Sequence, residues 1–476
     1  MEVTRHLGFQ TTARRLNRHR VEAIMCQFLI YWTRRKPSLG GERRMAGNAI
    51  TDTRDGSTAG RQLELSWLSP IGMTGLSIAN FIYRLFTLGI YDFWARTEVR
   101  KRLWSAIRLD GEPLVYTGTG KELFLGFIIV FGLVLLPMLL LSAGIILAFG
   151  PTSPVAQLFP LALYVFIFLL FGVAIYRAQR YRLLRTSWRG IRGSLDGNSW
   201  NYGWTYFWTF LLIPLTLGWI IPWRTTKLQT LITNDAMFGD REFSFKGDAG
   251  PLYGPFAMLW FGVFAIYVGA SLVFAVAIAA LQHTFGLDTL SPGGQLKPEI
   301  ASIVTIGTLG IVAMAYLLYL LISAWYRART INHFAKCTHF EGAQFKAKVT
   351  GAGLLWIDVT NILILLVGAL LLIIPLSIAA VLIVAVANSI DATLLESLLG
   401  PDVKSRFAAI SVPIAIFIMA LSFTLLLPVT QARAMGYFVS HLSIEGPIAL
   451  ERIAQSTADQ VSTGEGLAQA FDIDAF

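Results

Sequence analysis

Charged residues and cysteine are both scarce in this chain of 476 residues. Only 14% of the residues are charged, whereas 55% are hydrophobic, and the mean hydropathy is +0.59. A soluble protein of 52.6 kDa cannot bury that much apolar surface in its cores. The composition therefore excludes an ordinary soluble protein and predicts a membrane protein.

A disulfide scaffold is excluded, since Cys26 lies in a basic N-terminal segment and Cys337 in a segment that we expect in the cytoplasm. Hydrolase motifs such as Gly-x-Ser-x-Gly or His-Glu-x-x-His are missing as well. His333, Cys337 and His339 have a spacing that suits zinc, but no second cluster completes a site of four ligands. We therefore predict no metal, no cofactor and no enzymatic activity.

Long apolar stretches are abundant. Two of them, 72–94 and 203–223, are interrupted by the phrase Thr-Leu-Gly, which begins at Thr87 and at Thr216. Before that phrase each offers only about 15 regular residues, roughly 22 Å, which is short for a membrane crossing. Six others contain no Lys or Arg and are long enough to cross roughly 30 Å of hydrocarbon as helices: 123–149, 155–175, 255–281, 301–325, 354–387 and 407–429.

Lys and Arg mark the cytoplasmic side of a membrane protein. Here they concentrate in the segments that connect the apolar stretches, which we call arms: 95–122, 176–202, 224–253 and 326–353. The stretch 203–223 lies between two of these arms, so a complete crossing there would export one of them. We therefore predict that both interrupted stretches are re-entrant or in-plane segments that begin and end on the cytoplasmic side. In the alternative, both stretches span the membrane and the chain crosses it eight times.

The arms have structural signals of their own. Short alternating or aromatic segments at 114–116, 243–245 and 345–349 follow turn signals, which predicts β-hairpins that pair with one another beneath the membrane. The turn dipeptides are Asp110-Gly111, Asp196-Gly197, Gly239-Asp240, Glu341-Gly342 and Glu445-Gly446.

The second arm carries an amphipathic pattern. Tyr181, Leu184, Trp188 and Ile191 recur at helical spacing, which predicts an interfacial helix. Basic residues surround this apolar stripe, and we expect their guanidinium groups to contact lipid phosphate: Arg180, Arg185, Arg189 and Arg192.

These signals predict an all-α polytopic membrane protein with internal repeats of helical hairpins and broken half-helices, and with short cytoplasmic β-hairpins. The first repeat covers 62–202, the second 203–353, and a partial third with a cytoplasmic C-terminal arm and tail covers 354–476. Residues 1–61 are rich in arginine and lack periodicity, so we expect either a disordered tail or an over-extended gene start, with translation beginning at Met45. The net charge of +10 sits mostly in this tail and in the arms, which favours anionic lipids of the inner leaflet as partners over nucleic acid.

Polar residues inside the apolar stretches are the candidate site. Asn80 and Arg84 lie one helical turn apart in the first interrupted stretch, and Asp358 and Asn361 lie in the stretch 354–387. Such residues are costly to bury and often line a substrate or ion path between broken helices. In the structural alternative, the asparagines satisfy free backbone at the breaks, and Arg84 reaches lipid phosphate or pairs with Asp358.

A family resemblance rests on several strings of residues. The strings 85–96, 109–111, 116–123, 176–182, 185–192 and 464–468 are similar to those of the YjgN family of bacterial inner-membrane proteins. The resemblance implies the inner membrane and a multi-pass fold but no activity, because the family has no known function. The chain departs from the family pattern behind Thr360-Asn361, where a helical hairpin replaces a third Thr-Leu-Gly segment.

Two functions remain open at this point. In the first, the broken helices form a path for transport or lipid handling. In the second, the protein is a membrane scaffold that presents its cytoplasmic hairpin layer to a protein partner. An intramembrane enzyme needs a nucleophile or metal set that this sequence does not supply.

Overall fold

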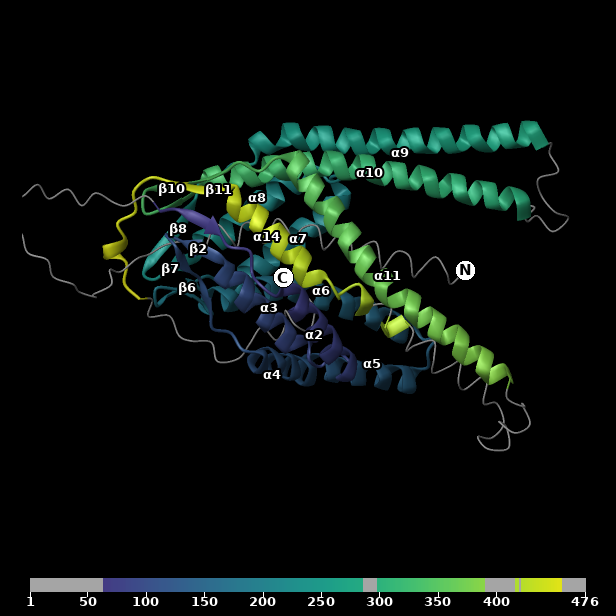
Figure 1. Cartoon of the computed structure of the whole chain (residues 1–476), viewed down its shortest axis with the longest axis horizontal. Coiled ribbons are helices and arrows are strands. Elements are labelled where there is room, and N and C mark those ends of the chain that lie inside the picture. Colours follow the sequence, from purple (N-terminus) through teal and green to yellow (C-terminus); the bar gives the residue numbers. More distant parts are fainter. Residues whose placement is uncertain (1–62, 286–297, 390–415, 419–420, 456–476) are drawn as a thin grey trace, which may run out of the picture.

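The computed structural model describes residues 63–285, 298–389, 416–418 and 421–455. The predicted N-terminal tail with Met45, residues 407–415 and 419–420 of the predicted helix 407–429, and the C-terminal tail beyond residue 455 lie outside these residues. Within the described part, helices dominate, and the strands lie together at one end of the molecule while the longest helices extend away from them (Figure 1).

Five helices are long and apolar enough to cross a membrane, at positions that the apolar stretches predict. The first is a continuous rod made of α4 (Gly120–Val130), a π-helical turn (Phe131–Leu135) and α5 (Leu136–Phe149). The other four are α6 (Pro154–Leu184), α9 (Gly250–Phe285), α10 (Pro298–Cys337) and α11 (Gly351–Ser389). Five of the six predicted spans are therefore confirmed as apolar helices of sufficient length.

The interrupted stretches form pairs of shorter helices. Helix α2 (Met73–Phe86) leads into α3 (Asp92–Ala106), and α7 (Ser199–Leu215) leads into α8 (Ile221–Asn234). Helix α14 (Leu427–Ser440) likewise follows a turn at 423–426. At 14 and 17 residues, α2 and α7 are shorter than the roughly 20 residues that a crossing requires.

Both ends of each pair lie at the sheets. Strand β1 (Leu65–Trp67), just before α2, pairs with β2 (Ile107–Leu109), just after α3. Strand β6 (Ile191–Leu195), just before α7, pairs with β7 (Ala236–Phe238), just after α8. Each helix pair thus leaves a strand and returns to its neighbour.

The described residues are mostly helical, as predicted, but the fold is not all-α, because they also contain two antiparallel sheets. The hairpins do pair with one another, and together they make an eight-stranded sheet in the order β11-β10-β9-β8-β7-β6-β5-β4. A three-stranded sheet has the order β1-β2-β3. The remaining strands are β3 (Glu112–Pro113), β4 (Val115–Tyr116), β5 (Thr186–Trp188), β8 (Arg241–Phe245), β9 (Thr338–Phe340), β10 (Ala343–Ala347) and β11 (Leu442–Glu445).

Turn chemistry explains the hairpins. Asp110, Arg189 and Glu341 each take a left-handed φ of about 50°, and each precedes a glycine at the turn between two paired strands. The second arm therefore turns at Arg189 and not at the predicted Asp196-Gly197, which follows β6. No interfacial helix forms there either, because α6 ends at Leu184 and the chain continues as β5 and β6.

The core lies where one face of the large sheet packs on the helices. Phe243, Phe340 and Phe345 come from three neighbouring strands and are almost fully buried, with the first two ring centroids 4.5 Å apart. Burying a side chain of this size stabilises the fold by about 1.5–3 kcal/mol. Distant parts of the chain close the structure, since α14 packs on α2 and β11 lies beside β1.

Helices α6 and α7 approach each other closely at two glycines. A Cβ atom on Gly172 would lie 2.9 Å from the Gly203 Cα, and one on Gly203 would lie 2.5 Å from a Val173 methyl. Neither position accepts a larger residue without movement of the other helix. This contact holds the second helix pair against the spanning helix α6.

Candidate functional site

The first helix break, between α2 and α3, is organised by one threonine. The Thr87 hydroxyl donates to the Tyr83 carbonyl (2.7 Å) and accepts a hydrogen bond from the Tyr91 N–H (3.0 Å). Leu88 and Gly89 follow with φ of 50° and 90°. The Thr87 side chain thus supplies an acceptor for an N–H at the start of α3, where a helix leaves such groups unpaired, and adds a second donor to a carbonyl that also accepts from the Thr87 N–H (3.0 Å).

The second break, between α7 and α8, repeats this geometry. The Thr216 hydroxyl donates to the Leu212 carbonyl (2.8 Å) and accepts from the Ile220 N–H (3.3 Å). Leu217 and Gly218 take φ of 49° and 87°. The shared phrase Thr-Leu-Gly therefore encodes a specific backbone turn, and the glycine is required where φ is most positive.

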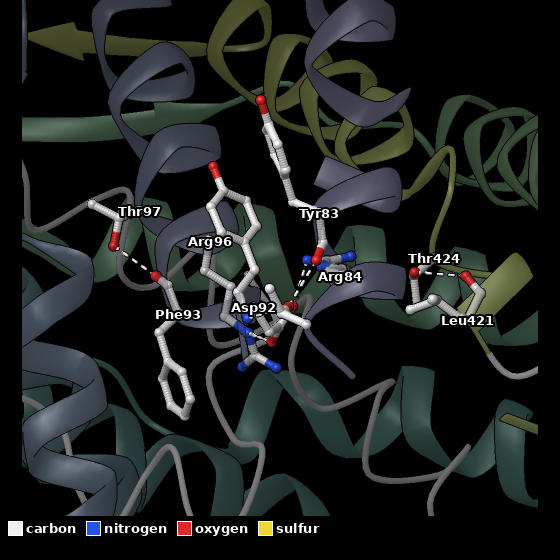
Figure 2. Close-up of polar contacts among 10 residues, drawn as sticks. Tyr83, Arg84, Asp92, Phe93, Arg96, Thr97, Leu421 and Thr424 are labelled. Atoms are coloured by element: carbon white, nitrogen blue, oxygen red, sulfur yellow. Dashed lines mark hydrogen bonds and ion pairs between the residues drawn. The ribbon is translucent and has the colours of Figure 1, made fainter. Parts of the chain in front are cut away.

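Arg84 lies beside the first break and is held by a carboxylate. Its Nη2 lies 2.5 Å from an Asp92 oxygen, and the Arg96 Nε pairs with the other oxygen of the same group. Figure 2 shows both arginines converging on Asp92. Asp92 is the first residue of α3, where the helix dipole favours a negative charge.

The predicted cluster is divided between two places. Asp358, on α11, pairs with Arg327 of α10, so the alternative in which Arg84 pairs with Asp358 is wrong. Asn361 lies one turn further along α11, and its Nδ2 donates to the Thr430 carbonyl of α14 (3.4 Å). The structure thus places Asp358 and Asn361 at the junction of α10, α11 and α14, and Asn80 and Arg84 on α2.

Two of the predicted residues keep polar atoms without partners. Asn80 is 2% exposed, and its Nδ2 has no hydrogen-bond partner among the described residues. The Oδ1 atom of the half-buried Asn361 likewise has no partner among them. Thr209 occupies the position in α7 that Asn80 occupies in α2, seven residues before the break threonine, and donates to the Thr205 carbonyl (2.6 Å). Thr209 could have been identified from the sequence, because it precedes Thr216 by the same seven residues by which Asn80 precedes Thr87.

The arginines of the second arm contact protein carboxylates. Arg185 pairs with Glu122 at 2.9 Å, and Arg189 pairs with Glu112. Arg180 and Arg192 are half-buried, and no side-chain partner is recorded for either in the described part of the chain. Contact of these residues with lipid phosphate stays a prediction.

Arg224 is a buried arginine that the sequence reasoning missed. It lies in the first turns of α8, is 5% exposed, and its Cζ is 4.5 Å from the centroid of the Tyr206 ring of α7. Its Nε and Nη2 have no hydrogen-bond partner in the part of the chain that the structure describes. The repeated sequence motif could have identified Arg224, because this residue directly follows the second copy, which ends at Trp223.

The possible zinc ligands do not converge. His333 Nε2 contacts the Asp248 carbonyl (2.8 Å), and His339 Nδ1 contacts the Cys337 carbonyl (3.1 Å). The Cys337 Sγ lies 3.8 Å from His333 Nε2. Within the described residues, no three side chains of His, Cys, Asp or Glu are grouped as metal ligands.

Comparison with known proteins places the chain among membrane proteins without an assigned activity. The family described as "Bacterial protein of unknown function (DUF898)" matches residues 72–470. A segment of 69 residues is 30% identical to the inner membrane protein YjgN of Salmonella typhimurium, covering 14% of this chain and 18% of that protein. No solved structure matches this chain.

Proposed function

Because the chain belongs to the YjgN family of bacterial inner-membrane proteins, grouped as proteins of unknown function (DUF898), we propose that it handles membrane lipid or a lipid-like substrate at the layer of its helix breaks. The observation that carries the proposal is the contrast between this layer and the helices beyond it. Arg84, Asn80 and Arg224 are buried in the layer, whereas no residue is buried in the most apolar 18-residue stretch of α9.

That contrast matches the two parts of a lipid. Beyond the break layer, α9 and α10 pair with each other and diverge from α11 and from the rod of α4 and α5 (Figure 1). Acyl chains would therefore surround each helical hairpin, since exposed apolar faces need a hydrocarbon environment. The buried arginines and asparagines would then lie at the depth of the headgroups.

The orientation is part of the proposal. The sheets and the basic arms lie in the cytoplasm, because Lys and Arg concentrate in those segments. The helix pairs α2–α3 and α7–α8 are then re-entrant, entering the membrane from the cytoplasm and returning to it. The recurrence of helix, break, helix and strand in α2–β2 and α7–β7, and of a turn at 423–426 followed by α14 and β11, supports a chain built of three related units.

Lipid movement in reconstituted vesicles tests the proposal. The full chain is placed in vesicles of phosphatidylethanolamine and phosphatidylglycerol, and the exchange of a fluorescent phospholipid between leaflets is measured. We expect faster exchange than in vesicles without protein, and phospholipid retained on the protein after purification. If exchange is no faster than in vesicles without protein and no phospholipid is retained on the purified protein, the proposal is overturned.

Asn80→Leu and Asn361→Leu separate a functional role from a structural one. Replacing an incompletely paired buried amide by a similar apolar group costs little stability, so both variants should unfold near the wild-type temperature. Exchange of the fluorescent phospholipid between leaflets should nevertheless fall, because a polar side chain that would contact the lipid headgroup is lost. Ser77→Ala is the matched control. The buried Ser77 hydroxyl already donates to the Met73 carbonyl (2.8 Å), so this substitution should leave lipid exchange unchanged.

A further inference from the structure

We propose that Arg224 is the anchor of a phosphate-binding site between α7 and α8, and that its ligand is a phosphate group from a lipid headgroup or from free phosphate. The site deepens the proposed function, on which its lipid arm rests.

The Arg224 guanidinium is buried without a counter-ion. Two of its nitrogens have no hydrogen-bond partner, and among the described residues no carboxylate forms an ion pair with it. Its recorded side-chain contact is the face of Tyr206. A ring face attracts a cation but supplies no hydrogen-bond acceptor in the guanidinium plane, so the in-plane N–H groups are left for a ligand.

At two other helix junctions a buried arginine pairs with an aspartate, which Arg224 lacks among the described residues. Arg84 has Asp92 at the first break, and Arg327 has Asp358 at the junction of α10 and α11. When the two copies of the phrase are aligned on Thr87 and Thr216, the position of Asp92 falls on Ile221. In the same alignment Arg84 falls on Ile213 and Arg224 falls on Ala95, so the second break has a buried cation at a different position and no acid at the position of Asp92.

Phosphate supplies the missing charge with suitable geometry. A guanidinium presents paired N–H donors that match two oxygens of a phosphate. The start of α8 adds to the attraction, because an anion is favoured near a helix N-terminus and the first turn of α8 contains no acidic residue. Trp223, beside Arg224, is 45% exposed, as expected for an aromatic side chain at the headgroup level.

The test measures phosphate-dependent stability of the full chain in detergent. Inorganic phosphate, dioctanoyl phosphatidylglycerol and dioctanoylglycerol, which lacks phosphate, are each titrated while the unfolding temperature is recorded. A ligand that binds only the folded protein raises that temperature. We expect phosphatidylglycerol to raise it and dioctanoylglycerol to have no effect; a response to inorganic phosphate alone identifies free phosphate as the ligand.

Variants assign the effect to this arginine. Arg224→Met should fold with unchanged or higher stability in the absence of phosphate, because it removes an uncompensated buried charge. Its apparent affinity should fall by roughly tenfold or more, since the charge-assisted bonds are lost. Arg224→Lys should weaken binding while keeping the charge, and Lys227→Gln, an exposed cation on the same helix, should bind like wild type.

The possible outcomes separate this site from the wider proposal. Wild-type protein that responds to neither phosphate ligand, or an Arg224→Lys variant that binds as well as wild type, would overturn the site even if lipid exchange is observed. Should Arg224→Met fail to fold, the Arg224→Lys comparison and the wild-type titration still decide. Binding of inorganic phosphate that depends on Arg224, with neither lipid exchange nor retained phospholipid, would support the site and overturn the proposed lipid handling.

Discussion

Asp92 shows how a single carboxylate makes buried cations tolerable in this protein. It lies at the start of α3 and contacts Arg84 and Arg96 together. Arg84 is 8% exposed, and its carboxylate partner offsets the cost of removing the charge from water. The sequence flags Arg84 through its apolar surroundings, but its partner is identified only when the break folds α3 back towards α2.

Asp92→Asn should therefore destabilise the protein strongly. The substitution keeps the shape of the side chain and leaves two arginines without their carboxylate, for which we expect a loss of about 3 kcal/mol in the free energy of unfolding. Thermal unfolding of the purified protein in detergent measures the loss. Glu98→Gln on the same helix removes a carboxylate from an exposed pair with Lys101 and should cost less than about 1 kcal/mol. Equal losses in the two variants would contradict the burial argument.

The other candidate residues illustrate the same limit. Asn80, Asp358 and Asn361 attract attention because polar groups are rare in apolar stretches. Asp358 pairs with Arg327, which is 31 positions away on another helix, and no spacing rule predicts that contact. Arg224 was overlooked because an arginine at the start of a basic arm resembles any other exposed cation.

At the scale of the element, the Thr-Leu-Gly phrase predicts a break and the structure explains it. The threonine donates to a carbonyl of one helix and accepts from an N–H of the next, while the leucine and glycine adopt positive φ. The same turn recurs at Thr216, as expected if the local sequence specifies it.

Thr87→Val and Thr216→Val should each weaken the break. Valine keeps the branched shape but removes both hydrogen bonds, so we expect a loss of about 1–2 kcal/mol in the free energy of unfolding for each variant. Chemical denaturation in detergent measures it. The control is Thr205→Val on α7, whose hydroxyl donates to a single carbonyl within the helix and bridges no break. A similar loss in this control would show that the double role of the break threonines is unimportant.

The mistaken interfacial helix has an instructive cause. Tyr181 and Leu184 lie in α6, whereas Trp188 lies in β5 and Ile191 in β6. The apparent helical period therefore runs across the end of a real helix into a hairpin. Short strands contain too few residues to establish a period of two, so that pairing with neighbouring strands decides their conformation.

At the scale of the whole molecule, strands from all parts of the described chain meet in one region. Because each helix pair departs from and returns to neighbouring strands, the connections at the sheets should all lie on one side of the membrane. The loop between α5 and α6, at the far end of those helices, should lie on the other side.

Accessibility of single cysteines tests this arrangement. In a variant with Cys26→Ser and Cys337→Ala, the exposed residues Asp196, Lys246 and Thr152 are replaced one at a time by cysteine. A membrane-impermeant maleimide should label the variants at Asp196 and Lys246 in inverted vesicles, and the variant at Thr152 in right-side-out vesicles. Labelling of Asp196→Cys and Lys246→Cys on opposite faces would refute the re-entrant arrangement of α7 and α8.

The sequence by itself determined that this is a membrane protein, where its long apolar helices lie, and where two helices break. Those features follow from composition, length and local hydrogen bonding, which act over a few neighbouring residues. Only the tertiary structure decided that the strands divide into a sheet of eight and a sheet of three, that Arg84 pairs with Asp92 and Arg327 with Asp358, and that Arg224 lies against Tyr206 instead. These contacts join residues far apart along the chain, and their energies depend on burial that exists only after the helices and strands have packed together.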